Sequence, residues 1–330
     1  MLETRYIAAC SLWSARVALL GLAFMATFAM SAETYPSRTI RLVVPAGAGG
    51  ITDILGRAIA AKLSESMGQP MVVENKPGAS AIIGTEFVAK SPPNGYTLLM
   101  FFPPHPVNPS LYAKLPYDTV KDFAPITMLG SVKLSLIVNA AFPAKDLNEL
   151  IKLAKESPGK LNYGIVDKGS LGHLGAELFL SMTGTRIAQI PYKGAPQAAA
   201  AVLSGDIALF FSTPNTAVPL IKAGKIRALG VSSRMRLDIL PGVPAISEVI
   251  PGYEVLGWNG IVAPAGTPSQ VIDLLHSEIV KSLKLSDMVS LFDKNGVDTV
   301  GNTPQQFAAI IKADIEKWAR VLKDAGIKPE

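Results

Sequence analysis

Ile40-Arg-Leu-Val-Val-Pro-Ala-Gly-Ala-Gly-Gly-Ile-Thr-Asp53 is the stretch that decides the fold. The apolar run Leu42 to Val44 predicts a buried parallel strand, and Pro45 ends it. After a glycine-rich turn, apolar residues recur at helical spacing from Ile51 to Leu63, until Gly68 ends the helix. A strand that runs through a short turn into an amphipathic helix is typical of an α/β sheet.

The turn itself is a candidate anion site. Its glycines carry no Cβ atom, so backbone N–H groups can approach a ligand closely, and a carboxylate or phosphate held there would lie at the positive end of the helix dipole. Asp53, at the third helical position, either contacts the ligand or only complements the dipole. The residues of this segment predicted to bind ligand are Ala46, Gly47, Ala48, Gly49, Gly50 and Asp53.

Two nucleotide-binding motifs do not fit the turn. The dinucleotide fingerprint Gly-x-Gly-x-x-Gly lacks its third glycine, since Gly47-Ala48-Gly49 is followed by Gly50, Ile51 and Thr52. The phosphate-loop pattern also fails, because no Gly-Lys-Ser/Thr follows. A purely structural strand-to-helix turn remains an alternative to an anion site.

Residues 1–32 have the features of a cleavable secretory signal peptide. Basic residues precede the apolar run Val17 to Met30, which is shorter than the roughly 20 residues that a spanning helix needs. Cleavage after Ser31 fits the small-residue rule better than cleavage after Ala32. The sequence therefore predicts an exported protein, and its mature form lacks cysteine because the single cysteine is Cys10.

Composition favours a globular protein with an anionic ligand. The 330 residues are 49% hydrophobic and 17% charged, with a net charge of +5. Lysine and arginine are scattered and form no basic stripe with interleaved aromatics, so nucleic acid is not an expected partner. About 300 residues after the leader are enough for two domains with a large core.

Strand and helix patterns alternate along the rest of the chain, as parallel sheets require. They predict strands near 71–73, 97–102, 134–138, 161–166, 186–190, 206–211, 226–231 and 253–262, and helices near 82–90, 172–183, 195–204 and 214–223. Three further helices are predicted to begin with capping-box pairs, at Asp146 with Glu149, Thr267 with Gln270 and Thr303 with Gln306. Residues 103–125 are expected to be irregular. We predict two lobes, 35–131 plus 253–330 and 132–252, each a mainly parallel sheet flanked by helices, with the ligand in the cleft.

A second glycine-rich loop, Asp167-Lys-Gly-Ser-Leu-Gly-His-Leu-Gly175, follows a predicted strand of the second lobe and precedes a helix. Gly169, Ser170 and His173 are its candidate ligand contacts. Ser170 is equally well placed as a plain helix cap, and a neutral His173 in the first helical turn could instead pack or hydrogen-bond locally. We expect this loop to face the first one across the cleft.

No catalytic or metal-binding pattern accompanies these loops. Ser80 and Ser170 do not lie in Gly-x-Ser-x-Gly, the motif of serine hydrolases. His105, His173 and His276 are not spaced as zinc ligands. The sequence therefore predicts a binding protein rather than an enzyme, without metal or cofactor, and an exported α/β enzyme remains a distant alternative.

Several different short motifs are distributed along the whole mature chain. They include Val73-Glu-Asn-Lys-Pro-Gly78, Asn94-Gly-Tyr-Thr-Leu98, Asn108-Pro-Ser-Leu-Tyr112, Pro158-Gly-Lys-Leu-Asn-Tyr-Gly164 and Pro191-Tyr-Lys-Gly194. In these motifs the chain resembles the Bug family, the periplasmic solute-binding proteins of tripartite tricarboxylate transporters. The resemblance implies a two-lobed, type II-like periplasmic binding protein, expected to be a monomer, that closes on a small carboxylated solute and works with membrane subunits of a transporter. A ligand sensor for a signalling system remains an alternative role.

Carried over to this chain, the family's ligand loops add Ser80, Phe102, His105, Asn108 and Ser212 to the candidate contacts. The first loop departs from the family pattern, because Pro45-Ala46-Gly47-Ala48 lacks the usual aromatic residue after the proline. With Phe101 and Phe102 on the opposite loop, this departure predicts a wider and more apolar cleft. An aromatic carboxylate stacked on a phenylalanine is therefore one candidate ligand.

Overall fold

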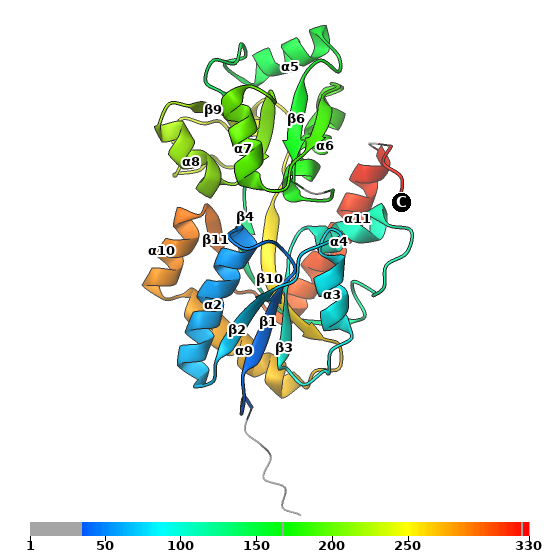
Figure 1. Cartoon of the computed structure of the whole chain (residues 1–330), viewed down its shortest axis with the longest axis vertical. Coiled ribbons are helices and arrows are strands. Elements are labelled where there is room, and N and C mark those ends of the chain that lie inside the picture. Colours follow the sequence, from blue (N-terminus) through cyan, green and yellow to red (C-terminus); the bar gives the residue numbers. More distant parts are fainter. Residues whose placement is uncertain (1–34, 167, 325, 330) are drawn as a thin grey trace, which may run out of the picture. The chain divides into compact units, whose positions relative to one another are not determined.

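The computed structural model describes residues 35–166, 168–324 and 326–329 (Figure 1). The predicted signal peptide and both of its candidate cleavage sites lie outside the described residues. Within the described ranges, no helix is long and apolar enough to cross a membrane.

A six-stranded sheet, here called the large sheet, takes its strands from both halves of the sequence and has the order β11-β4-β10-β3-β1-β2. The strands and the helices around them are β1 Ile40–Val44, α2 Ile51–Met67, β2 Met71–Asn75, α3 Ile82–Ala89, β3 Thr97–Phe101, α4 Pro104–Leu111, β4 Phe123–Val132, β10 Gly257–Pro264, α9 Ser269–Leu283, α10 Ser286–Lys294, β11 Val297–Thr299 and α11 Pro304–Asp324. The predicted strand, turn and helix at the start are thus present as β1 and α2.

A five-stranded sheet, here called the small sheet, has the order β7-β6-β8-β5-β9 and is built from the middle of the chain. Its elements are β5 Ser135–Asn139, α5 Leu147–Glu156, β6 Asn162–Ile165, α6 Leu171–Thr183, β7 Ala188–Pro191, α7 Ala195–Ser204, β8 Leu209–Ser212, α8 Pro214–Lys222, β9 Ile226–Val231 and the short 3-10 helix η2 Ile246–Glu248. The predicted lobe boundaries at 131 and 253 stay a prediction, although the strands on either side of them do belong to different sheets.

Both sheets are mixed rather than mainly parallel. In the large sheet β1 is parallel to β2 and β3, but β10 is antiparallel to both β3 and β4. In the small sheet β6 is parallel to its two neighbours, whereas β5 is antiparallel to β8 and β9. In the large sheet the reason lies in β10. The chain leaves for the small sheet through β4 and returns through β10, which pairs antiparallel along β4, with Gly257 opposite Val132.

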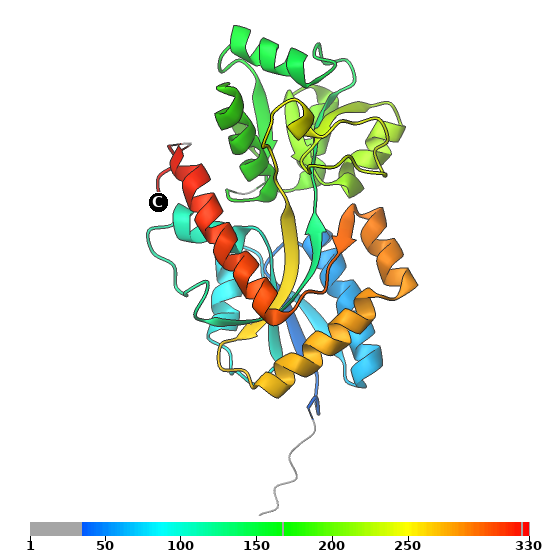
Figure 2. The same ribbon diagram turned by 180° about the vertical axis from the view of Figure 1, so that it is seen from behind.

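The large sheet is covered on both faces. On one face α2 lies so close to the strands that a Cβ at Gly56 would be 3.2 Å from the Val44 side chain. Because side chains alternate along a strand, Val43 points to the other face, where it joins a buried cluster with Trp258 and with Phe307 of α11. Figure 2 shows α11 crossing the sheet on this side. The loops after the parallel strands therefore emerge from a rigid, doubly covered sheet.

The region expected to be irregular contains a helix. Residues 104–111 form α4, and its first two prolines lie in the first turn, where a missing N–H costs no helical hydrogen bond. The expectation was wrong because proline content was taken to exclude a helix. The helix α10 and the strand β11, which follow α9, were not predicted either.

Helix starts agree with the sequence patterns in two of three cases. Thr303 and Gln306 form the predicted reciprocal capping box, with bonds of 3.0 and 3.2 Å. Asp146 accepts the Glu149 amide at 2.9 Å and so caps α5 as predicted. Thr267 differs, because its hydroxyl donates to the Pro264 carbonyl at 2.7 Å and the helix begins only two residues later.

Candidate functional site

The glycine-rich turn between β1 and α2 is exposed over residues 47–50. Gly49 has a φ of +80°, a conformation that favours glycine. A hydrogen bond of α2's first turn runs from the Ile54 amide to the Gly50 carbonyl at 3.0 Å. Amides at the start of a helix have no intrahelical acceptor, so those of residues 50–52 are the donors that can hold an anion here.

Asp53 shapes this turn from within. Its side chain is buried, and its carboxylate accepts hydrogen bonds from the Gly49 amide (2.8 Å), Arg57 Nε (3.0 Å) and Asn75 Nδ2 (2.9 Å). Burial acts to raise the pKa of this carboxyl, but the three donors and the charge of Arg57 outweigh burial and hold the pKa below its usual range. Asp53 and Gly49 were predicted to contact the ligand, but in the free protein the Asp53 oxygens and the Gly49 amide hydrogen-bond within the turn. We therefore expect both to orient the turn.

Replacing Asp53 by alanine removes all three hydrogen bonds at once. We expect the free energy of unfolding, measured by urea denaturation at pH 7, to fall by about 2–3 kcal/mol. The control is Glu65→Ala on the same helix, where an exposed ion pair with Lys62 should change stability by less than about 0.5 kcal/mol. Equal losses in the two variants would show that the turn does not depend on Asp53.

Ser80 and Asn108 meet at the turn between β2 and α3. The amide Nδ2 of Asn108 donates to the Ser80 carbonyl at 2.9 Å, and Asn108 is fully buried on α4. The buried side chain of Asn108 therefore holds the backbone of this turn. The Ser80 hydroxyl is half-buried and remains a candidate ligand contact.

His105 belongs to the core of the large sheet. It is fully buried, its ring lies 3.9 Å from that of Phe101, and its Nε2 is 2.9 Å from Thr85 Oγ1. Burial lowers the pKa of His105 to about 3, so the imidazole is neutral near pH 7. In the free protein the ring has a packing role and is not exposed, and ligand contact by His105 stays a prediction. Phe102 is only half-buried and stays available to a ligand.

The β6–α6 loop brings Gly169, Ser170 and His173 together as predicted, but with local roles. Ser170 Oγ accepts the His173 amide at 3.4 Å and caps α6. His173 is buried, and its Nδ1 accepts the Gly169 amide at 3.1 Å, which leaves the proton on Nε2, 3.8 Å from Glu177. Burial is the main reason that the pKa of His173 lies below its usual value. In the free protein Ser170 is therefore a helix cap and His173 packs and hydrogen-bonds locally, the two alternatives to ligand contact considered from the sequence.

Exposure divides the predicted site residues into two groups. Those at least partly exposed are Ala46, Gly47, Ala48, Gly49, Gly50, Ser80, Phe102 and Ser170. Those that are buried are Asp53, His105, Asn108, Gly169, His173 and Ser212. Of the buried residues, Asp53 bonds the Gly49 amide, His105 the Phe102 amide and Asn108 the Ser80 carbonyl, so these three position exposed members of the first group.

Sequence reasoning missed three residues that support the site. Asn75 bonds both Asp53 and the Ala46 carbonyl, the latter at 3.1 Å. Tyr112 donates to Ser80 Oγ at 3.1 Å, and Thr85 bonds His105. Asn75 and Tyr112 lie within motifs already noted for their resemblance to a family, so a signal existed for them. Nothing in the sequence pattern singled out Thr85.

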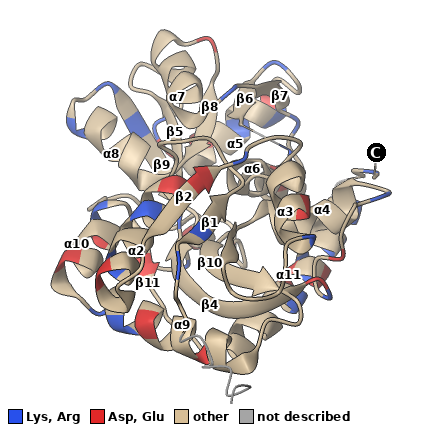
Figure 3. Cartoon of the chain, turned by 60° about the horizontal axis from the view of Figure 1, so that its bottom comes forward, with Lys and Arg blue, Asp and Glu red and all other residues tan. Residues whose placement is uncertain are grey.

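Charges around these loops are sparse and mixed. Figure 3 shows Lys and Arg interspersed with Asp and Glu along the ribbon. Among the described residues, no group of three or more His, Cys, Asp or Glu is placed to hold a metal ion. Backbone amides are therefore the main anion donors that the site offers.

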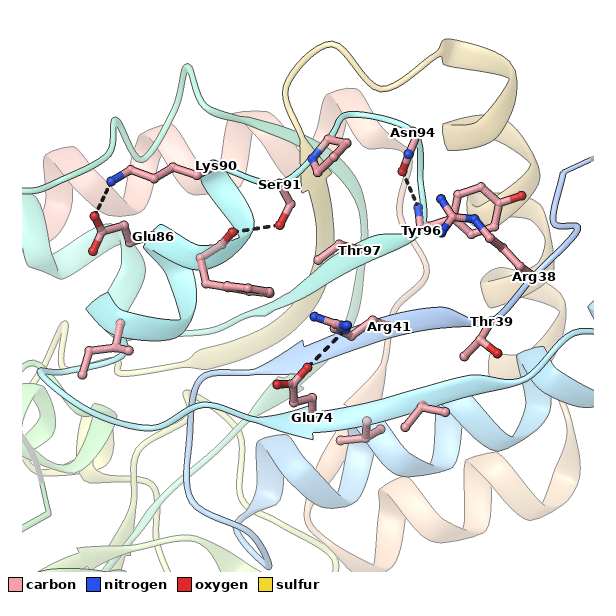
Figure 4. A pocket seen from close by; sticks show the side chains of 15 residues that line it. Arg38, Thr39, Arg41, Glu74, Glu86, Lys90, Ser91, Asn94, Tyr96 and Thr97 are labelled. Atoms are coloured by element: carbon pink, nitrogen blue, oxygen red, sulfur yellow. Dashed lines mark hydrogen bonds and ion pairs between the residues drawn. The ribbon is translucent and has the colours of Figure 1, made fainter.

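A separate cavity of about 970 Å3 lies beside α3 at the amino-terminal ends of β2, β1 and β3 (Figure 4). Its charged side chains pair with one another, Arg41 with Glu74 at 3.2 Å and Lys90 with Glu86 at 2.5 Å. None of the predicted site residues lines it. Ligands of α/β sheets bind at the carboxyl ends of the strands, so we do not assign ligand capture to this cavity.

Two mixed α/β sheets with glycine-rich turns at helix N-termini fit the architecture expected of a solute-binding protein. Residues 55–327 match the family model described as "Tripartite tricarboxylate transporter family receptor". The chain belongs to this family, TctC, to which the Bug proteins are related in structure. This confirms the resemblance noted from the sequence motifs.

Three solved structures show the same fold. Rpa4515 of R. palustris, solved with adipate, is 36% identical, with a TM-score of 0.84 over 90% of this chain and 100% of its own. The periplasmic binding protein BugD is 31% identical, with a TM-score of 0.82 over 90% and 100%. MatC of Rhodopseudomonas palustris, solved with bound malate, is 29% identical, with a TM-score of 0.81 over 87% and 100%. BugD is described as a periplasmic binding protein and the matched family model as a receptor, which confirms the prediction of a receptor rather than an enzyme.

Proposed function

We propose that this protein captures a small dicarboxylate in the periplasm, after removal of its signal peptide, and presents it to the membrane subunits of a tripartite tricarboxylate-type transporter. The observation that carries the proposal is the exposed turn before α2, where the amides of residues 50–52 lack intrahelical acceptors. A carboxylate there would receive charge-assisted hydrogen bonds at the positive end of the helix dipole. We further expect the receptor to be a monomer.

The start of α6 offers a second anion position. Ser170 is the N-cap of α6, as Gly50 is the N-cap of α2. The first amides that follow each N-cap have no acceptor within the helix. The β6–α6 loop also lies next to the large sheet's loops, since Ser80 Oγ donates to the Lys168 carbonyl at 3.3 Å. Two helix N-termini from different sheets suit a ligand with a carboxylate at each end, such as the adipate and malate of the relatives.

The aromatic carboxylate considered from the sequence has less support than an aliphatic one. Phe101 is fully buried and packs on His105, Phe123 and Trp258, so it cannot stack on a ligand. Only Phe102 keeps an accessible face. An aromatic ligand stays a prediction that the same experiment tests.

Ligand capture predicts a specific stabilisation. Adipate or malate at a hundred times its dissociation constant should add about 2.7 kcal/mol to the free energy of unfolding and raise the melting temperature. Terephthalate tests the aromatic alternative, and hexanediamine, which has the length of adipate but the opposite charge, is the control. A screen of aliphatic and aromatic carboxylates in which none shifts the melting temperature would refute the proposal.

A further inference from the structure

The turn between β2 and α3 has an unfavourable backbone. Ala79, Ser80 and Ala81 all have positive φ, at 46°, 50° and 73°, directly after Gly78 at 130°. Residues with a Cβ atom avoid the left-handed region, because Cβ crowds the following carbonyl oxygen. Glycine would relieve this crowding, yet none of the three positions carries it. Strain of this kind persists where surrounding contacts enforce it, and it concentrates at functional sites.

The helix α4 supplies the contacts that enforce this turn. Asn108 Nδ2 donates to the Ser80 carbonyl at 2.9 Å, and Tyr112 Oη donates to Ser80 Oγ at 3.1 Å. Asn108 lies on α4 and Tyr112 directly follows it, so both contacts come from the end of this helix. Ser80 is thereby held by its backbone and its side chain together.

The Ser80 hydroxyl also reaches the small sheet. It donates to the carbonyl of Lys168 in the β6–α6 loop at 3.3 Å. The next residue in that loop, Gly169, packs against α4 so closely that a Cβ atom would be 2.9 Å from the Leu111 side chain. The same helix, α4, therefore contacts both the turn that carries Ser80 and the loop that Ser80 bonds.

We infer that Ser80 is a positioning residue for ligand capture. Its hydroxyl, oriented by Tyr112, ties the turn of the large sheet to the β6–α6 loop and so sets the distance between the anion-binding starts of α2 and α6. Glycine would avoid the backbone strain at position 80 but would lack the hydroxyl. The hydroxyl therefore accounts for the presence of serine at this position. This inference rests on the proposed function for its ligand-binding consequence, but the tie itself exists in the free protein.

Three variants separate the hydroxyl from the strain. Ser80→Ala removes the hydroxyl and keeps the strain, Ser80→Gly removes both, and Tyr112→Phe removes only the partner that orients Ser80. The control is Ser91→Ala, because Ser91, two residues beyond α3, donates its hydroxyl to the Phe87 carbonyl of that helix at 2.8 Å, away from Ser80 and the β6–α6 loop.

The first readout is hydrogen exchange in the ligand-free protein. The Gly169 amide, which is bonded to His173, should exchange at least about fivefold faster in all three variants and at the normal rate in Ser91→Ala. Ser80→Gly should also melt at a higher temperature than Ser80→Ala, because it releases the strain. Unchanged exchange at Gly169 in both Ser80 variants would overturn the inference, as would a lower melting temperature for Ser80→Gly than for Ser80→Ala.

The second readout is calorimetric affinity for adipate and malate. Both Ser80 variants should bind the ligand of the wild-type protein about tenfold more weakly, with Tyr112→Phe in between and Ser91→Ala unchanged. Normal affinity together with faster exchange would also overturn the inference, since the tie would then have no part in capture. If the wild-type protein binds neither acid, the proposed dicarboxylate fails, whereas the exchange experiment still decides whether the tie exists.

Discussion

Replacing Gly50 by valine is expected to weaken dicarboxylate binding by more than a hundredfold while the protein stays folded. Gly50 has φ and ψ of −76° and 166°, extended backbone that valine adopts readily. A Cβ atom there would meet only the Gly47 carbonyl, at 3.7 Å. The branched side chain would therefore fill the hollow of the turn without a clash in the fold. Each lost hydrogen bond to a carboxylate costs about 1.5–3 kcal/mol, so losing two amides explains the expected size.

The matched control for this experiment is Gly50→Ala. Its single methyl group imposes nearly the same backbone restriction but fills much less of the turn, so the affinity should fall only severalfold. Calorimetry with adipate and malate measures both variants, and circular dichroism with thermal melting checks that both are folded. Normal binding by a folded Gly50→Val protein would mean that the turn is structural and that the ligand's anion lies elsewhere.

Acid is expected to destabilise the protein through His105 well above the pH at which carboxylates are protonated. The pKa of this buried imidazole is about 3 in the folded protein, against an ordinary value of about 6.5 in the unfolded chain. Between these values the unfolded state binds one more proton than the folded state, so stability falls as the pH falls. The loss approaches about 1.4 kcal/mol per pH unit well below pH 6.5 and amounts to about 2.3 kcal/mol from pH 6.5 to 4.5.

Urea denaturation at several pH values between 7 and 4.5 measures this loss. His105→Phe should show a slope smaller by about 1.4 kcal/mol per pH unit, whatever its absolute stability. Part of the slope should remain, because the pKa of buried His173 is also below its ordinary value. His276→Gln is measured alongside as the comparison, because it replaces a histidine that is half-buried rather than buried. Identical slopes for the wild type and His105→Phe would place the acid sensitivity elsewhere.

The sequence determined the local elements and the class of protein. Apolar periodicity reports which face of a helix or strand is buried, and this is a local property, so β1, α2 and most later elements were predictable. Clusters of glycine, which has no side chain, correctly predicted turns at the carboxyl ends of strands. The caps at Asp146 and Thr303 were predictable because each partner is three residues away.

Only the tertiary structure decided which of the predicted residues are exposed and which are buried. Asp53 is turned inward by Asn75, 22 residues away, and Ser80 bonds the Lys168 carbonyl, 88 residues away. His105 is buried because Phe101 and Thr85 pack around it. The antiparallel insertion of β10 beside β4 likewise joins distant segments. These partners are far apart in the sequence and meet only in the folded chain. The 2-residue period of strands and the 3.6-residue period of helices report local burial and do not identify such partners.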